Sequence, residues 1–162
     1  MLRVERSTYF GPELPPSSLL QDADHVAKIL LNVEISFESA STSSVRSHLL
    51  EILDSLEWAI KSRPLESIPF RTSAVSSNRS ALQCQFGNIA NAFYDLMKLQ
   101  LVFSKGLATG CILIVPMRRT AKQINSNVAN YETILSNLDA GFSSFITAPL
   151  VLMGIESGSD DL

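Results

Sequence analysis

The stretch ALQCQFGNIANAFYDLMKLQLVF, residues 81–103, decides the fold. Its first residues alternate in polarity, as the two faces of a β-strand do. The apolar face would hold Leu82, Cys84 and Phe86. The opposite face would hold Ala81 with two amides, Gln83 and Gln85, which is an unusual pair for a strand at the centre of a fold. We therefore expect this strand to lie at a functional site.

A polar turn and a helix follow the strand. Gly87 and Asn88 form the turn, and Asn88 is suited to cap a helix. The next apolar residues recur at steps of three and four, at Ile89, Ala92, Phe93, Leu96, Leu99 and Phe103. The order is therefore strand, polar turn and helix.

The rest of the chain alternates in the same way between helical and strand-like patterns. Further helices are predicted at 23–37, at 45–60 with Ser43 or Ser44 as cap, and at 121–138 with a possible break at Asn125-Ser126-Asn127. Further strands are predicted at 70–75, 111–117 and 150–155. The segment 70–75 would form a hairpin with the strand at 81. Together they predict an α/β fold with a mixed β-sheet flanked by helices.

Length and composition favour a single domain. A chain of 162 residues with 46% apolar residues can bury one sizeable core. Residues 1–22 contain three prolines and predict an N-terminal arm, residues 23–156 the domain, and residues 157–162 a flexible acidic tail. The longest apolar runs fall far short of the ~20 residues of a membrane span. Because Cys84 and Cys111 lie in apolar runs without metal-ligand spacing, we expect reduced core thiols and a cytoplasmic protein.

The formal net charge of −3 argues against promiscuous nucleic-acid binding, which phosphate contacts dominate. A site-specific binder remains compatible with it, because a cleft on an acidic molecule can be locally basic. The candidate basic residues are Arg71, Arg79, Arg118, Arg119 and Lys122. For each of them an equally good interpretation is a solvent-exposed loop residue that does not contact DNA.

Several ordered blocks together resemble a known family of nucleases. They are LQCQFGN (82–88), FYDLMKLQLVF (93–103), ILIVPM (112–117), NSNVANYE (125–132) and PLVLMGIE (149–156). Read together, they are similar to the core of the BglII and BstYI group of type II restriction endonucleases, in the PD-(D/E)XK superfamily. The resemblance implies a restriction-endonuclease-like core, double-stranded DNA with GATC-centred palindromes as the ligand, a homodimer, and Mg²⁺ as the cofactor of active relatives.

The resemblance also assigns site positions, and two of them lack the expected acid. In the family, the strand reads hydrophobic-Glu-hydrophobic-Gln-aromatic, and an Asp on the preceding strand completes the magnesium site. Gln85 matches the family Gln, but Gln83 stands at the Glu position and, counting back, Ala74 at the Asp position. Neither side chain supplies the negative charge that Mg²⁺ requires.

The implied DNA-reading positions are better preserved. Asn88 falls where the family reaches into the major groove, although it could simply cap the helix. Ser126, flanked by Asn125, falls where the family has a serine near base edges, although it could simply lie in a polar loop. Arg79 is the nearest basic residue before the strand.

Three hypotheses follow. The first is a degenerate restriction-endonuclease-like DNA-binding protein, a pseudoenzyme without metal-dependent cleavage at the usual position. The second is an active Mg²⁺-dependent site-specific endonuclease with relocated carboxylates, drawn from Glu51, Asp54, Glu57, Glu66 and Asp95. The third is a structural or protein-interaction module that uses an exposed glutamine face as its contact surface. Magnesium-dependent nicking would separate the second from the first, and retardation of a DNA duplex would separate both from the third.

Overall fold

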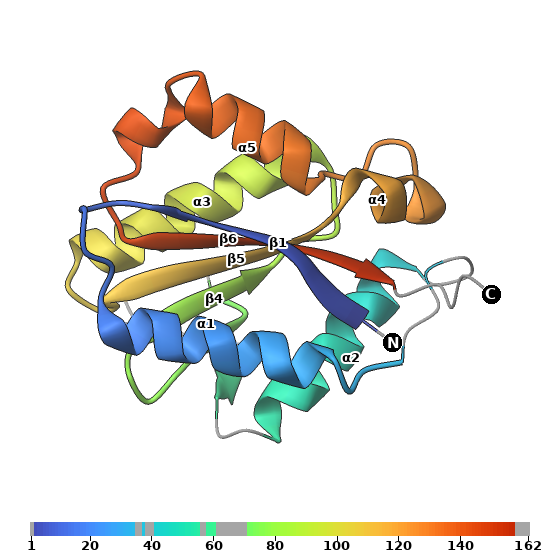
Figure 1. The fold of residues 1–162 in the computed structure, drawn as a ribbon, viewed down its shortest axis with the longest axis horizontal. Helices are drawn as coiled ribbons and strands as arrows, with labels where there is room; N and C mark the ends of the chain where they lie inside the picture. The colour runs from blue at the N-terminus through green and yellow to red at the C-terminus, as the bar shows by residue number, and fades with distance from the viewer. Residues whose placement is uncertain (1, 35–36, 38–40, 56–57, 61–70, 158–162) are drawn as a thin grey trace.

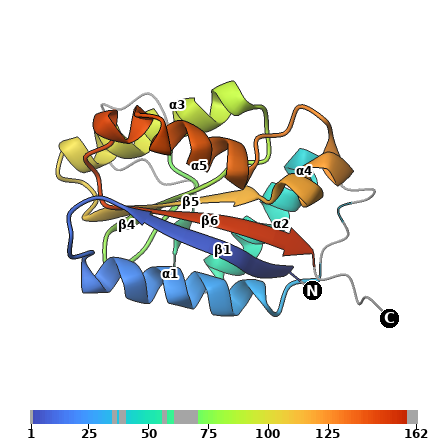
Figure 2. The ribbon, with the colours of Figure 1, turned by 45° about the horizontal axis from the view of Figure 1, so that its top comes forward.

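The computed structural model describes residues 2–34, 37, 41–55, 58–60 and 71–157, and these residues form one mixed sheet between two layers of helices (Figures 1 and 2). The sheet has the order β1-β6-β5-β4-β3-β2. Its strands are β1 (Leu2–Phe10), β2 (Ala59–Ile60), β3 (Ala74–Val75), β4 (Ser80–Cys84), β5 (Gly110–Pro116) and β6 (Leu150–Ser157). β4, β5 and β6 are parallel, whereas β1 pairs antiparallel with β6, and β2, β3 and β4 form an antiparallel meander. The predicted α/β fold is confirmed.

Helices cover both faces of the sheet. They are α1 (Ser17–Leu30), α2 (Thr42–Asp54), α3 (Ile89–Ser104), α4 (Arg118–Ile124) and α5 (Tyr131–Asp139), followed by the 3₁₀ helix η1 (Phe142–Phe145). α1 and α2 pack on one face, and α3 and α5 pack on the other. Each face therefore has its own apolar core. None of the described helices has the length and apolar character needed to cross a membrane.

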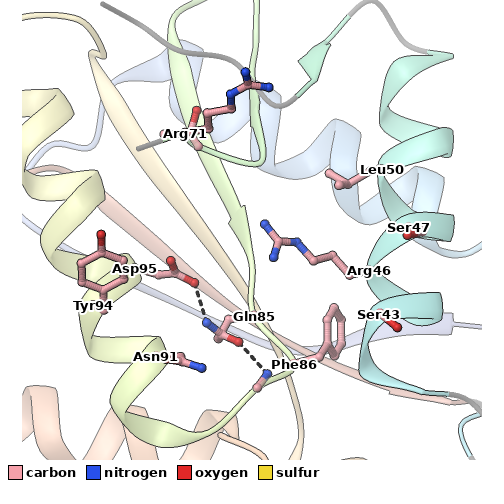
Figure 3. A pocket seen from close by; sticks show the side chains of 12 residues that line it. Ser43, Arg46, Ser47, Leu50, Arg71, Gln85, Phe86, Asn91, Tyr94 and Asp95 are labelled. Atoms are coloured by element: carbon pink, nitrogen blue, oxygen red, sulfur yellow. Dashed lines mark hydrogen bonds between the residues drawn. The ribbon is translucent and has the colours of Figure 1, made fainter. Parts of the chain in front are cut away.

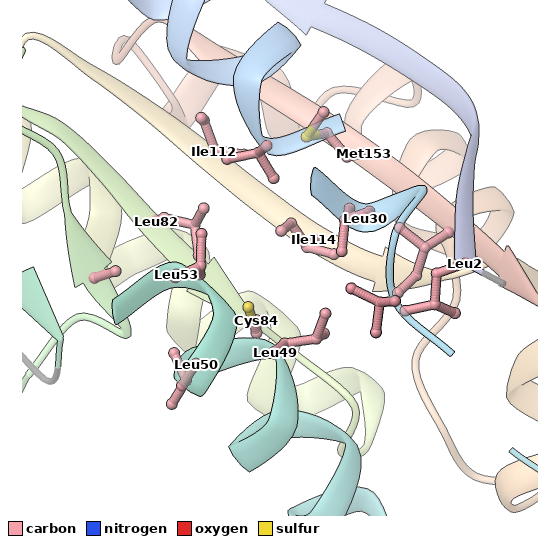
Figure 4. Packing of buried hydrophobic residues seen from close by; sticks show 14 of the residues in the cluster. Leu2, Leu30, Leu49, Leu50, Leu53, Leu82, Cys84, Ile112, Ile114 and Met153 are labelled. Carbon is pink, nitrogen blue, oxygen red and sulfur yellow. The ribbon is translucent and has the colours of Figure 1, made fainter. Parts of the chain in front are cut away.

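The alternation in β4 sorts its side chains between these two cores, as predicted. Leu82 and Cys84 pack with Ile112 and Ile114 of β5 against α1 and α2 (Figure 4). Ala81 belongs to the core beneath α3 and α5. Gln83, which alternates with Leu82, therefore faces α3, and this orientation decides what the glutamine can contact.

The N-terminal segment is a strand, so the predicted arm at residues 1–22 is wrong. β1 pairs with β6 along its length, and Leu2 is fully buried in the core under α1. Glu5 and Arg6 are exposed on this edge strand. Charged side chains on an edge strand protect it from pairing with other chains. Because β1 carries such charges, its composition resembles that of an N-terminal arm.

Several predicted boundaries also change. α1 begins at Ser17, directly after Pro16, and ends at Leu30, so the predicted helix at 23–37 begins too late and ends too late. α2 is capped by Ser41, whose side chain accepts a hydrogen bond from the Ser44 amide, and it ends at Asp54. The predicted helix at 45–60 is thus too long. At the other end of the chain Ser157 is the last residue of β6, and the remainder of the predicted tail, 158–162, lies outside the described residues.

Candidate functional site

Gln83 is fully buried and bridges β4 to α3. Its Nε2 donates to Oδ1 of Asp95 over 2.8 Å, and its Oε1 accepts a hydrogen bond from the backbone N–H of Ser73. A buried amide without such partners would destabilise the fold by roughly 1 to 3 kcal/mol. The glutamine therefore depends on the carboxylate of Asp95.

Gln85, two residues on, repeats this arrangement. Its Nε2 donates to Oδ2 of Asp95 over 2.6 Å, and its Oε1 accepts from the backbone N–H of Gly87 over 2.5 Å (Figure 3). A Cβ at position 87 would lie 2.8 Å from that Oε1, so the close approach favours glycine. In both glutamines the oxygen meets a backbone donor and the nitrogen meets a carboxylate, which fixes the orientation of each amide.

Asp95 is the one carboxylate of this network, and Lys98 balances its charge. Lys98 Nζ lies 2.5 Å from Asp95 Oδ1, three residues along α3, and both residues are buried. The Lys98 ammonium also lies 5.2 Å from the centroid of the Tyr94 ring. Because a buried ion pair needs further hydrogen bonds to offset its desolvation, the two glutamine amides complete the partners of Asp95.

Ala74 does not lie across from the glutamines, so this part of the implied site is wrong. It pairs with Leu82 in the β3–β4 hairpin and is fully buried with it in the core beneath α1 and α2. Ser73 contacts Gln83 instead, and its hydroxyl accepts from the backbone N–H of Cys84 over 3.2 Å. Side chains alternate along a strand, so an error of one residue in counting back moves a position to the opposite face.

A cavity of about 610 Å³ opens beside this network, between α2, the end of β4 and α3 (Figure 3). Gln85 and Asp95 reach it, whereas Gln83 is buried behind them. Arg46 extends into it from α2, and Arg71, which precedes β3, also lines it. The cavity thus joins the carboxylate of Asp95, the side-chain amides of Gln85 and Asn91, and two guanidinium groups.

The DNA-reading candidates after the glutamine strand lie together. Asn88 is exposed and caps α3, because its Oδ1 accepts from the Asn91 amide over 3.0 Å. Its backbone forms a β-bridge with Val128, which places the loop containing Asn125 and Ser126 next to it. Both of these loop residues are exposed. The predicted cap is confirmed, and the structure brings these three polar residues to one edge of the sheet.

Arg79 does not join them. It occupies the β3–β4 turn at a φ of 65°, at the opposite end of β4 from Asn88, and its guanidinium donates to the Gly106 carbonyl over 2.7 Å. The basic residues near Asn88 are instead those of α4, which follows the parallel strand β5 at the same edge of the sheet. They are Arg118, Arg119 and Lys122, and all three are exposed.

Of the proposed relocated carboxylates, only Asp95 is seen at the site. Glu51 and Asp54 are exposed on α2, and Glu51 lies 3.8 Å from His48. Glu57 and Glu66 fall outside the described residues. Within the described ranges, no group of three or more histidine, cysteine, aspartate or glutamate side chains could hold a metal ion.

The interaction-module hypothesis requires an exposed glutamine face, but the two glutamines do not form an exposed surface. Gln83 has no solvent exposure and Gln85 is half-buried.

The sequence analysis did not identify Lys98 and Arg46 as site residues. The available signal for Lys98 was that it and Asp95 are the only charged residues of α3, whereas no pattern in the sequence marked Arg46.

Comparisons with known proteins point to one family and one fold. Residues 16–155 match the family model described as restriction endonuclease BglII/BglIII. The crystal structure of restriction endonuclease BglII complexed with a DNA 16-mer superposes with a TM-score of 0.75 at 12% identity, over 95% of this chain and 75% of that one. Free BglII superposes with a TM-score of 0.64 at 14% identity, over 99% of this chain and 81% of that one. A comparison with curated proteins gave no match.

Proposed function

The chain belongs to the restriction endonuclease BglII/BglIII family, and from this we propose that it is a DNA-binding member without metal-dependent cleavage at the usual position. The observation that carries the proposal is the Gln83–Asp95–Gln85 network. Both glutamines present nitrogen, not oxygen, towards the only carboxylate of the described site. The strand therefore supplies hydrogen-bond donors where a metal site needs oxygen ligands.

These residues do not fit the Mg²⁺ of active relatives. Magnesium binds hard oxygen ligands in near-octahedral geometry and is usually held by one or two carboxylates with substrate phosphate. Here both oxygens of Asp95 accept hydrogen bonds from glutamine amides, and the Lys98 ammonium lies 2.5 Å from one of them. A cation at this carboxylate would have to displace an ammonium of like charge.

DNA binding is supported by the edge of the sheet where Asn88, Asn125 and Ser126 gather. Exposed asparagine amides can pair bidentately with adenine in the major groove, and the basic residues of α4 beside them can contact phosphate. The related BglII structure is a complex with DNA. We propose double-stranded DNA as the ligand, with base contacts from these three residues, and a cytoplasmic setting in which the buried free cysteines stay reduced.

We further propose a homodimer formed through an exposed apolar surface on α3 and η1, made of Tyr94, Met97, Leu101, Phe142 and Phe145. Its aromatic side chains are between 49% and 70% exposed. At the usual area of such rings, three of them would contribute roughly 260 to 440 Å². This is a third to a half of the ~800 Å² that one partner buries in a standard interface. Tyr94 also lines the cavity, so a dimer on this surface would set two cavities close to each other.

Binding and nicking measurements test the proposed function. Fluorescence anisotropy with a pool of labelled duplexes should show binding without added metal, and supercoiled plasmid should stay intact in Mg²⁺ or Mn²⁺. The second candidate function is an endonuclease that uses Asp95, since this carboxylate lies at the site. Nicking by the wild type that is lost in Asp95→Asn would favour it. Absence of binding to every duplex would refute the DNA-binding function.

Sedimentation tests the dimer. The wild type should sediment as a dimer at micromolar concentration, and Phe145→Asp should sediment as a monomer because it places a charge at the most exposed side chain of the apolar surface. Leu31→Asp is the matched control, since Leu31 is 48% exposed at the end of α1 on the other side of the sheet. A monomeric wild type, with and without DNA, would refute the dimer.

A further inference from the structure

Arg46 is a cation without a described partner. No described carboxylate forms an ion pair with it, although Arg3, Lys28 and Lys98 each form one in the same part of the chain. Its side chain extends from α2 towards the end of β4, beside Gln85 (Figure 3). Arg71, on the same cavity, also lacks an ion-pair partner among the described residues.

The charge of the cavity is therefore positive. Arg46 and Arg71 each contribute +1, and the only acidic residue of the lining, Asp95, is neutralised by Lys98 directly behind it. The two guanidinium charges are left without a counter-ion from the described protein. A divalent cation would be repelled from such a cavity, and an anion would be attracted.

Neutral hydrogen-bond donors accompany the two guanidinium groups. Ser47 lies next to Arg46 on α2, and Asn91 faces it from α3, and both line the cavity. A guanidinium binds two oxygens of a phosphate at once, and hydroxyl and amide groups can satisfy the remaining ones. The volume of about 610 Å³ exceeds what a phosphate alone requires and leaves room for the sugar attached to it.

We infer that this cavity binds a phosphate group directly through Arg46 and Arg71, without a bridging metal ion. The inference rests on the proposed function in so far as the phosphate is one of the DNA backbone. A magnesium-dependent nuclease has a negatively charged site that holds a cation between its carboxylates and the phosphate. Here the site is positively charged, and arginine contacts the phosphate directly. Binding to DNA then requires no metal at this position.

The test is the salt dependence of duplex binding in EDTA for the wild type, Arg46→Gln and Arg6→Gln. Loss of one phosphate contact should make the negative slope of log K against log salt shallower by about 0.9 and weaken binding roughly 10-fold at low salt, equally for all sequences. Arg6→Gln removes the same charge from an exposed position on β1, at the far edge of the sheet, and should leave the slope unchanged. Arg46 is exposed, so its replacement should not disturb folding.

A second measurement separates the phosphate site from the DNA-binding function. Inorganic phosphate, compared with chloride at equal ionic strength, should raise the melting temperature of the wild type and of Arg6→Gln but not of Arg46→Gln. If the wild type and Arg46→Gln bind duplex with the same affinity and slope, or if binding requires Mg²⁺, the inference is wrong while the DNA-binding function stands. If no duplex binds, that function fails, and the phosphate measurement alone decides whether the cavity is an anion site.

Discussion

Gln83→Glu places a second carboxylate against Asp95 and therefore tests the central network directly. Gln83 Nε2 lies 2.8 Å from Asp95 Oδ1, and the substitution puts a carboxylate oxygen at this position. Two unit charges about 4 Å apart repel each other by about 4 kcal/mol at an effective dielectric constant of about 20. Lys98, 2.5 Å from the same Asp95 oxygen, offsets part of this. We expect a net loss of roughly 1 to 3 kcal/mol in the free energy of unfolding near neutral pH.

The loss should depend on pH with a definite sign. The neighbouring negative charge raises the pKa of the introduced glutamate in the folded protein above its usual value of about 4.3. Below that value the group is protonated in both the folded and the unfolded state, so the variant should differ least from the wild type. As pH rises from about 4.3 to the raised folded pKa, the unfolded state releases its proton first, and the stability of the variant falls progressively relative to the wild type.

Urea denaturation at about pH 5 and about pH 8 measures this difference, with Gln83→Met as the matched control. Methionine removes the amide without adding a charge, so its cost should be the same at both pH values. Added Mn²⁺ or Mg²⁺ should not restore stability to Gln83→Glu at the higher pH, because the Lys98 ammonium, 2.5 Å from Asp95 Oδ1, occupies the position that a cation would take. If Gln83→Glu and Gln83→Met lose the same stability at both pH values, then Gln83 does not face Asp95.

Three further predictions follow from other contacts. Ala74→Asp should lose several kcal/mol in urea denaturation because it buries a carboxylate in an apolar core, whereas Ser73→Asp should lose much less since its oxygen can still accept from the strand amide. Asn88→Ala should lose ~1 kcal/mol of stability as a helix cap and also weaken duplex binding at one base pair, which binding to single-substituted duplexes would reveal; if Asn88→Asp binds every duplex as the wild type does, the residue is only a cap. Burial raises the pKa of Cys84 and of Cys111 to about 12, so thiolate is negligible until strongly alkaline pH, and both should react with a thiol reagent only after unfolding; rapid native-state labelling would contradict this.

The centre of the fold could be predicted because its patterns are local. The alternation around Gln83 and the continuous apolar runs of β5 and β6 reflect only which environment each of the two faces of the strand meets, so they can be recognised within each strand's own sequence. β1 was missed because it is an edge strand whose exposed charges resemble those of an arm. α2 was predicted too long because the chain leaves the helix after Asp54 and enters a short strand, which only its pairing with β3 defines.

The site could be predicted only in part. That Gln83 and Gln85 share a face follows from the period of a strand, but their common partner Asp95 lies on the next element and is set by how α3 packs across β4. The sequence analysis placed Ala74 at the site, where the structure has Ser73, and this error has a different cause. The register of the hairpin is fixed by its turn, where the Ser76 amide bonds to the Ser80 carbonyl, and counting residues in the sequence does not reveal this register.

The network at β4 explains why return to a metal site needs more than one change. A buried glutamine amide requires an acceptor, and Asp95 provides one for both Gln83 and Gln85. A buried carboxylate in turn requires a counter-charge, which Lys98 supplies. Restoring an acid at Gln83 alone leaves Lys98 where a cation would bind, and removing Lys98 alone leaves Asp95 buried without its counter-charge. Stability therefore opposes each single step, while the positive cavity beside the network stays open to a phosphate.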